Sequence, residues 1–127
     1  KKVKSSLGPV LAETLLAKLA KWEEGKKFLE KNITATKLAT AFHTNPKYIS
    51  ELVRQYRGKK FTKYVNDLRI DHIVELLKTE NKFRNYTNEA LAVEGGFGST
   101  QIFTRAFKDR VKMSPTTFID QLENLNP

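Results

Sequence analysis

Apolar residues recur along the chain at the three- and four-residue spacing of amphipathic helices, and no segment alternates as a half-buried strand would. Proline, glycine and capping residues punctuate this pattern at both ends of most apolar stretches. The combined pattern predicts helices at residues 9 to about 25, 37–42, 46–57, 62–80, 88–94, 99–110 and from 115 through 122. The predicted fold class is therefore all-α.

Two of these segments carry the clearest apolar faces. In the 46–57 helix, Asn45 is the expected cap and Gly58 the expected end, with Ile49, Leu52, Val53 and Tyr56 on one side. In the 62–80 helix, apolar residues from both halves of the segment form the predicted buried face. Its members are Tyr64, Val65, Leu68, Ile73, Val74 and Leu77, a face broad enough to contact partners on both sides. The following stretch "TENKFRNYTN" is predicted to be a polar connection.

The chain contains an internal repeat. "GKKFTKYV" aligns with "KMSPTTFI" at an offset of 54, which places Gly58 on Lys112, and "LA" at Leu38 aligns with "LA" at Leu91 at an offset of 53. Each copy is a short helix, a turn and a second helix, with one additional residue in the second copy. That residue falls in the glycine cluster "GGFG".

A short helix, a tight turn and a second helix make the outline of a helix-turn-helix. Ala39 and Ala92 are small where the second helix crosses the first. The turn needs a residue that tolerates positive φ, which Gly95 or Gly96 provides in the second copy and Thr44 or Asn45 must provide in the first. We predict two helix-turn-helix subdomains joined by a linker helix, with an extra N-terminal helix. The expected boundaries are 1–32 for the N-terminal helix and connection, 33–61, 62–80 for the linker, and 81–127.

The glycine cluster does not fit a nucleotide cradle. A P-loop requires Gly-Lys-Ser/Thr after a strand, and the Gly-x-Gly-x-x-Gly pattern fails because position 101 is Gln. In the alternative, Gly96 takes the bend, Phe97 fills the core, and Ser99, or failing it Thr100, caps the next helix. The cluster is predicted to be a turn.

The formal net charge of +9, from 23 Lys and Arg against 14 Asp and Glu, favours a polyanionic partner. Nucleic acid is the first such partner and an anionic membrane the second, although Glu13, Glu23 and Glu24 argue against a membrane helix at residues 9–30. The chain has no cysteine, which excludes disulfides and thiolate metal sites. No apolar run approaches the ~20 residues of a membrane span.

The stretch "LAVEGGFGSTQIFTRAFKDRVKMSP" resembles the second helix-turn-helix of the AraC/XylS family of bacterial transcription regulators. "LATAFHTNPKYISELVRQYRGKKFTKYVNDLRI" is similar to the first one, and the resemblance covers about residues 33 to 122. Two departures from the family pattern have structural meaning. Gly95 stands where an apolar residue is usual and predicts a looser turn, and Lys112 stands at a glycine site and predicts a different helix end.

The resemblance implies sequence-specific binding of double-stranded DNA, with each second helix in a major groove and the two motifs in successive grooves. The base-reading residues it implies are Lys47, Ser50, Glu51 and Arg54 in the first copy and Thr100, Gln101, Thr104 and Arg105 in the second. Phosphate contacts are expected from helix N-termini and flanking bases. These residues are Thr36, Lys37, Arg57, Lys59, Lys60, Ser99, Lys108 and Lys112.

No convergent catalytic or metal-binding set is visible, since His43 and the pair Asp71–His72 stand alone. We therefore expect no enzyme activity, no cofactor and no small-molecule ligand in this fragment. RNA polymerase and an upstream sensor or dimerisation domain, missing from this fragment, are expected partners. The predicted location is cytoplasmic, although the full-length protein can be membrane-anchored through its missing N-terminal part. A helical adaptor that binds an acidic protein or RNA is the alternative. Apolar outward residues on both second helices would favour it, but these residues are polar.

Overall fold

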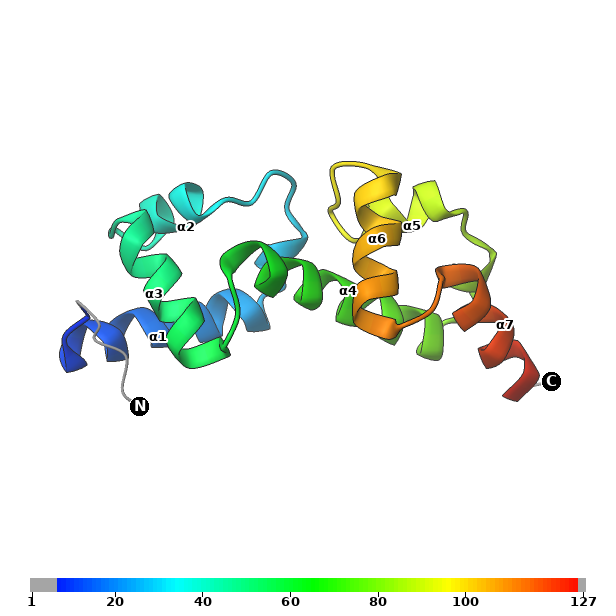
Figure 1. The fold of residues 1–127 in the computed structure, drawn as a ribbon, viewed down its shortest axis with the longest axis horizontal. Helices are drawn as coiled ribbons and strands as arrows, with labels where there is room; N and C mark the ends of the chain where they lie inside the picture. Colours follow the sequence, from blue (N-terminus) through cyan, green and yellow to red (C-terminus); the bar gives the residue numbers. More distant parts are fainter. Residues whose placement is uncertain (1–6, 126–127) are drawn as a thin grey trace. The chain divides into compact units, whose positions relative to one another are not determined.

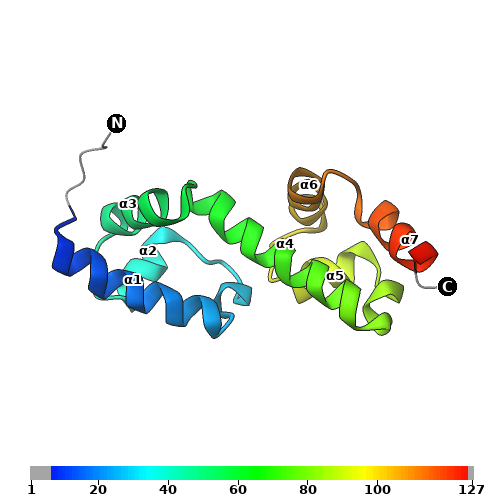
Figure 2. The same ribbon diagram turned by 90° about the horizontal axis from the view of Figure 1, so that it is seen from below.

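The computed structural model describes residues 7–125, and every regular element among them is helical. Seven α-helices and two short 3₁₀ turns follow one another along this part of the chain (Figures 1 and 2). They are α1 (Pro9–Glu24), η1 (Lys27–Leu29), α2 (Ala35–Ala41), α3 (Pro46–Arg57), α4 (Phe61–Thr79), η2 (Asn81–Asn85), α5 (Asn88–Glu94), α6 (Thr100–Val111) and α7 (Pro115–Leu125). The predicted all-α fold class is confirmed.

The chain divides into two compact units, and the division falls within α4. The first unit contains the residues up to Phe28 together with Ile33–Val65, and the second contains Leu29–Asn32 and the chain from Asn66 onward. Each unit holds one short helix packed on one longer helix, α2 on α3 and α5 on α6. These two pairs are the predicted helix-turn-helix motifs.

The core of the first unit forms where α1 and α2 pack on α3. Leu15, Leu19, Ile49 and Leu52 are at most 1% exposed, and Trp22 is buried beside them. Tyr56, which the sequence places on the same side of α3 as Ile49 and Leu52, is 39% exposed in the last turn of the helix. Full burial on this side of α3 therefore stops at Val53, one turn before the helix ends.

The core of the second unit is built around two phenylalanines of α6. Phe103 and Phe107 are fully buried, and their ring centroids are 5.8 Å apart in an edge-to-face arrangement. Helix α4 contributes Ile70, Ile73 and Leu77, of which Ile70 escaped the sequence prediction, while Leu68 and Val74 are only partly buried. The remaining buried residues come from the flanking elements: Phe83, Leu91, Ala92, Phe97 and Leu122.

The repeat is visible in the ends of the two second helices. The side chain of Asn45 accepts a hydrogen bond from the backbone N–H of Tyr48, and that of Ser99 accepts one from the N–H of Ile102. At the other end Gly58 has φ 71° and ψ 21°, and Lys112 has φ 70° and ψ 20°. The predicted difference at Lys112 is therefore wrong, because lysine adopts the same left-handed cap that glycine adopts in the first copy.

The two turns also share one geometry. The N–H of Thr44 donates to the carbonyl of Ala39 at 2.9 Å, and the N–H of Phe97 donates to the carbonyl of Ala92 at 2.9 Å. The left-handed residue is Gly96 in the second turn, with φ 77°, and His43 in the first, with φ 60°. The prediction of Thr44 or Asn45 for that role is wrong.

Tight packing explains the doubled glycine. A Cβ on Gly96 would lie 2.3 Å from the carbonyl oxygen of Leu29, and one on Gly95 would lie 2.9 Å from the ring of Phe97. Both glycines are buried. The role of the cluster as a turn is thus steric as well as conformational, and this close packing argues against the looser turn expected from Gly95.

Candidate nucleic-acid interface

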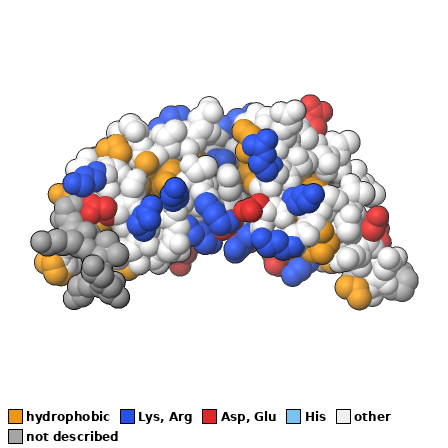
Figure 3. Space-filling view, in the orientation of Figure 1, with side chains coloured by type: hydrophobic (Ala, Val, Ile, Leu, Met, Phe, Trp, Pro, Cys, Tyr) orange, Lys and Arg blue, Asp and Glu red, His pale blue; other side chains and the backbone are white. Residues whose placement is uncertain are grey.

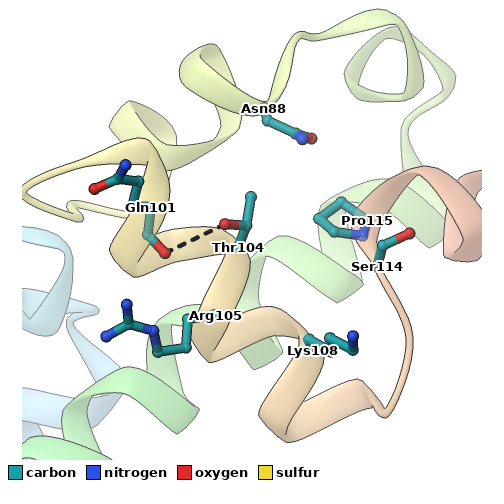
Figure 4. A pocket seen from close by; sticks show the side chains of 7 residues that line it. All are labelled: Asn88, Gln101, Thr104, Arg105, Lys108, Ser114 and Pro115. Carbon is teal, nitrogen blue, oxygen red and sulfur yellow. Dashed lines mark hydrogen bonds between the residues drawn. The ribbon is translucent and has the colours of Figure 1, made fainter.

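Helix α6 exposes a polar face at its N-terminal end. Gln101 and Arg105 are exposed, and Thr100 and Thr104 are half-buried beside them. The hydroxyl of Thr104 donates to the backbone carbonyl of Gln101 at 3.2 Å, which fixes the threonine along the helix (Figure 4). The side chains of Gln101 and Arg105 bind no other described residue and remain available to a ligand.

A hollow of about 540 Å³ lies along this face of α6. It brings together four predicted residues, Gln101, Thr104, Arg105 and Lys108, from successive turns of the helix (Figure 4). Its remaining walls come from the starts of the neighbouring helices and were not predicted. These residues are Asn88, Ser114 and Pro115. Both helix starts carry capping hydroxyls, at Thr87 and Ser114, and this capping pattern is the sequence signal that points to them.

Helix α3 exposes the corresponding face in the first unit. Lys47, Ser50 and Arg54 are exposed, and Glu51 is half-buried. Because Asn45 caps α3 where Ser99 caps α6, Lys47, Ser50 and Glu51 lie in its first two turns as Gln101, Thr104 and Arg105 do in α6. Arg54 lies one turn further on, at the position that Lys108 occupies in α6. The structure thus places the base-reading residues predicted in each copy on the second helix of a helix-turn-helix.

A paired arginine fixes the last turn of each of these helices. Arg57 donates from Nε and Nη2 to the two carboxylate oxygens of Glu23, each at 2.9 Å, and the hydroxyl of Tyr64 also donates to Glu23. Arg110 makes the equivalent paired contact with Asp71, at 3.0 Å for both bonds. Bidentate ion pairs of this kind fix the relative orientation of the two side chains as well as the distance between them.

The Glu23 contacts change its titration. Burial by itself raises the pKa of Glu23, but the hydrogen bonds from Arg57 and Tyr64 and the charge of Arg57 outweigh it, so the pKa falls below its usual value. Burial and the neighbouring Glu23 raise the pKa of Tyr64, which therefore stays protonated as a donor. The hydrogen bond to Asp71 raises the pKa of Arg110. At neutral pH Glu23 is therefore ionised, Tyr64 is neutral and Arg110 is charged, as their hydrogen bonds require.

The residues predicted to contact phosphate fall into two groups by exposure. Thr36, Lys37, Lys60, Lys108 and Lys112 are exposed. Lys59 and Ser99 are partly buried, and so is Arg57, whose guanidinium is bound to Glu23. The face shown in Figure 3 carries more Lys and Arg side chains than Asp and Glu ones.

Other kinds of site find little support in the described residues. No group of three or more His, Asp or Glu side chains lies close enough to hold a metal ion within residues 7–125. In the same part of the chain, no helix combines the length and apolar character needed to cross a bilayer.

Two compact units, each with a capped second helix that exposes a polar face, define a double helix-turn-helix domain. A family model described as a helix-turn-helix domain matches residues 38–121. The chain belongs to this family, the AraC-type helix-turn-helix domains, which are DNA-binding domains of transcription regulators and not enzymes.

Related proteins agree with this assignment. The chain is 32% identical over 75 residues to the uncharacterized transcriptional regulatory protein YesN of Bacillus subtilis (strain 168), a match that covers 58% of the chain and 20% of the relative. The chain thus spans about a fifth of that relative's length.

Two solved structures share the fold. The C-terminal domain of AraT, a response regulator from Geobacillus stearothermophilus, matches with a TM-score of 0.70 at 21% identity, over 92% of this chain and 88% of that one. The DNA-binding domain of AdpA, a global transcriptional factor solved in complex with a target DNA, matches with a TM-score of 0.74 at 18% identity, over 90% and 96%.

Proposed function

We propose that the chain binds double-stranded DNA sequence-specifically and thereby regulates bacterial transcription, with α3 and α6 in successive major grooves. The observation that carries this proposal is the exposed polar face of α6, where the side chains of Gln101 and Arg105 bind no other described residue and border a hollow that Lys108 also lines. In a helix-turn-helix these early positions of the second helix face the base edges. The relative AdpA, which was solved with DNA, supports the same assignment.

The side chains on α6 suit specific bases. Arg105 can bind guanine through its O6 and N7 atoms, and Gln101 can bind adenine through N6 and N7, each pairing being worth roughly 1–3 kcal/mol of discrimination. Thr100 and Thr104, which are half-buried beside them, complete the proposed base-reading set. Because the hydroxyl of Thr104 already donates to the Gln101 carbonyl, its methyl group is the part most available to a base.

In the first copy, the proposed base-reading residues are Lys47, Ser50, Glu51 and Arg54. The carboxylate of Glu51 can accept a hydrogen bond from the amino group of cytosine, whereas Arg54 favours guanine. An acidic residue at this position repels phosphates, so we assign Glu51 to specificity and not to affinity.

The phosphate contacts are proposed to flank these base contacts. The set is Thr36, Lys37, Arg57, Lys59, Lys60, Ser99, Lys108 and Lys112. Among them Lys60 is exposed. The guanidinium of Arg57 is bound to Glu23 and would have to contact the phosphate at the same time. Replacement of an exposed lysine, such as Lys60, by a neutral residue should therefore report most directly how much phosphate contacts contribute to DNA affinity.

Arg105→Ala tests base reading. A preferred duplex is first selected from a random pool with the intact chain, and binding is then measured to that duplex and to single-base variants. Arg105→Ala should lose roughly 1–3 kcal/mol of discrimination at one guanine position and leave the other positions unchanged. Arg105→Lys is the matched control: it keeps the charge but not the two-pronged geometry, so it should lose the same discrimination while keeping more affinity.

Lys60→Ala tests phosphate binding. This variant should weaken binding to all duplexes alike and reduce the slope of log affinity against log salt concentration by about one. Lys78→Ala removes an exposed lysine outside the proposed contact set and should leave that slope unchanged. Salt-independent binding, or binding to RNA or an acidic protein without duplex binding, would refute the proposed function.

For the whole protein we propose two further partners, RNA polymerase and an upstream sensor or dimerisation domain, together with a cytoplasmic location or a membrane anchor in its N-terminal part. The length of YesN, of which the matched segment is 20%, supports a further domain outside this segment. Co-purification of the full-length protein with RNA polymerase on its selected duplex tests the first partner.

A further inference from the structure

One large apolar side chain lies beside the polar face of α6. Ile102 is 47% exposed, although it lies between Gln101 and the core residue Phe103 in the first turn of the helix. In an α-helix, residues three apart are surface neighbours, so Ile102 lies beside Arg105. Among residues 100–111 of α6, it is the one apolar side chain that is exposed.

The position of Ile102 is fixed by the helix start. Its backbone N–H donates to the Ser99 hydroxyl at 3.1 Å, so the first turn is held by a cap directly beneath the side chain. A β-branched side chain in a helix has one strongly preferred rotamer. Ile102 therefore presents a nearly fixed apolar surface to whatever lies against α6, without losing much rotamer freedom when it binds.

The major groove offers one apolar group on its base edges, the C5-methyl group of thymine. We propose that Ile102 packs against a thymine methyl and makes thymine a determinant of the sequence that the second unit prefers. This inference rests on the proposed function, since it requires α6 to enter the major groove. It adds an apolar contact to the polar readout by Gln101 and Arg105.

The spacing along the helix also places the thymine. Side chains at i and i+3 have Cβ atoms about 5–6 Å apart, whereas successive bases of one strand rise by about 3.4 Å. The thymine contacted by Ile102 should therefore lie within one or two base steps of the guanine read by Arg105.

A deoxyuridine scan tests this contact without altering the protein. Deoxyuridine pairs like thymine but lacks the methyl group, so each thymine of the selected duplex is replaced in turn and affinity is measured with the intact chain. One replacement, within two steps of the guanine lost in Arg105→Ala, should weaken binding about fourfold, the effect expected for burial of one methyl group. A loss of affinity at any other thymine, such as one that faces the Thr104 methyl group, should persist in Ile102→Ala.

Ile102→Ala then links that effect to this residue. The variant should bind the thymine and deoxyuridine duplexes equally, because the methyl group has lost its apolar partner. Val93→Ala is the matched control: Val93 is a 59% exposed apolar residue of α5 in the same unit, and its loss should preserve the fourfold difference. Both substitutions are on the surface, and unchanged thermal unfolding verifies that each variant is folded.

The outcomes separate this inference from the proposed function. Specific duplex binding with no thymine near the Arg105 guanine, or with full deoxyuridine sensitivity in Ile102→Ala, overturns the role of Ile102 and leaves DNA binding intact. Absence of duplex binding by the intact chain overturns both. A deoxyuridine effect that disappears only in Ile102→Ala supports the inference.

Discussion

Gly96 and Gly98, two residues apart in the turn before α6, should respond oppositely to alanine. Gly96 has φ 77°, and an added Cβ would lie 2.3 Å from the Leu29 carbonyl oxygen and 2.8 Å from its carbon, both backbone atoms. A left-handed alanine is strained and the clash requires backbone movement, so Gly96→Ala should lower the free energy of unfolding by roughly 2–5 kcal/mol. Chemical denaturation followed by circular dichroism measures this loss.

Gly98→Ala is the control for that prediction. An added Cβ at Gly98 meets no atom within 4 Å, and its backbone is outside the left-handed region. Alanine should then stabilise the fold by about 0.4–1 kcal/mol by restricting the unfolded chain. Equal losses in both variants would show that the turn tolerates no side chain anywhere and would contradict the steric role of Leu29.

Individual residues show where the sequence is sufficient and where it is not. Asn45, Ser99 and Gly96 were predictable because capping and left-handed turns favour particular residue types. His43 and Lys112 were not, since both adopt a left-handed conformation that residues other than glycine adopt only in a small share of cases. In those places the surrounding helix packing decides the backbone, and no local signal in the sequence reports it.

The same limit applies to the site. The exposed residues of α6 followed from the helix-turn-helix pattern, because helical periodicity separates the buried Phe103 and Phe107 from Gln101 and Arg105. The pairing of Arg57 with Glu23 was not predictable, since 34 residues separate them and only the fold brings them together.

At the scale of elements, the pairing of α3 with α1 through Glu23 should make stability depend on pH. The usual pKa of the carboxyl is 4.5, and the folded pKa is lower. A lowered folded pKa stabilises the native state above the unfolded value, and this contribution is lost as pH falls through the folded pKa. Glu23→Gln should therefore destabilise the protein by about 1–2 kcal/mol at pH 7 and progressively less below pH ~4.5.

Denaturation curves of wild type and Glu23→Gln at several pH values measure this convergence. Glu24→Gln is the matched control, because Glu24 is the exposed neighbour on the same helix and should show no such convergence. If the difference in free energy of unfolding between wild type and Glu23→Gln stays constant from pH 7 to pH 3, the carboxylate charge contributes nothing to the contact between α1 and α3.

Helix boundaries were also largely predictable, because Pro9, Pro46 and Pro115 open helices and Gly58 closes one. The segment after α4 was not: the predicted polar connection forms η2 and buries Phe83. One aromatic residue in a polar stretch gives no periodic signal. Its burial depends on Leu77 and the other members of the second core, which are distant from it in sequence or on another helix.

At the scale of the whole molecule, two separate cores predict two unfolding events. Trp22, the single tryptophan of the chain, is 8% exposed in the first unit and packs against Phe28 and Tyr64 there. Its fluorescence therefore reports that unit. Circular dichroism of the helices reports both units, so comparison of the two signals separates their transitions.

Phe103→Ala removes one of the two largest fully buried side chains of the second core and should cost that unit about 3–5 kcal/mol. The circular dichroism curve should then gain an early transition, while the midpoint of Trp22 fluorescence stays unchanged. Leu52→Ala, which removes a fully buried side chain from the first core, should instead move the fluorescence midpoint by the equivalent of about 2–5 kcal/mol. If Phe103→Ala moved the fluorescence midpoint as far as Leu52→Ala does, the shared helix α4 would transmit stability between the units and the chain would unfold as one cooperative domain.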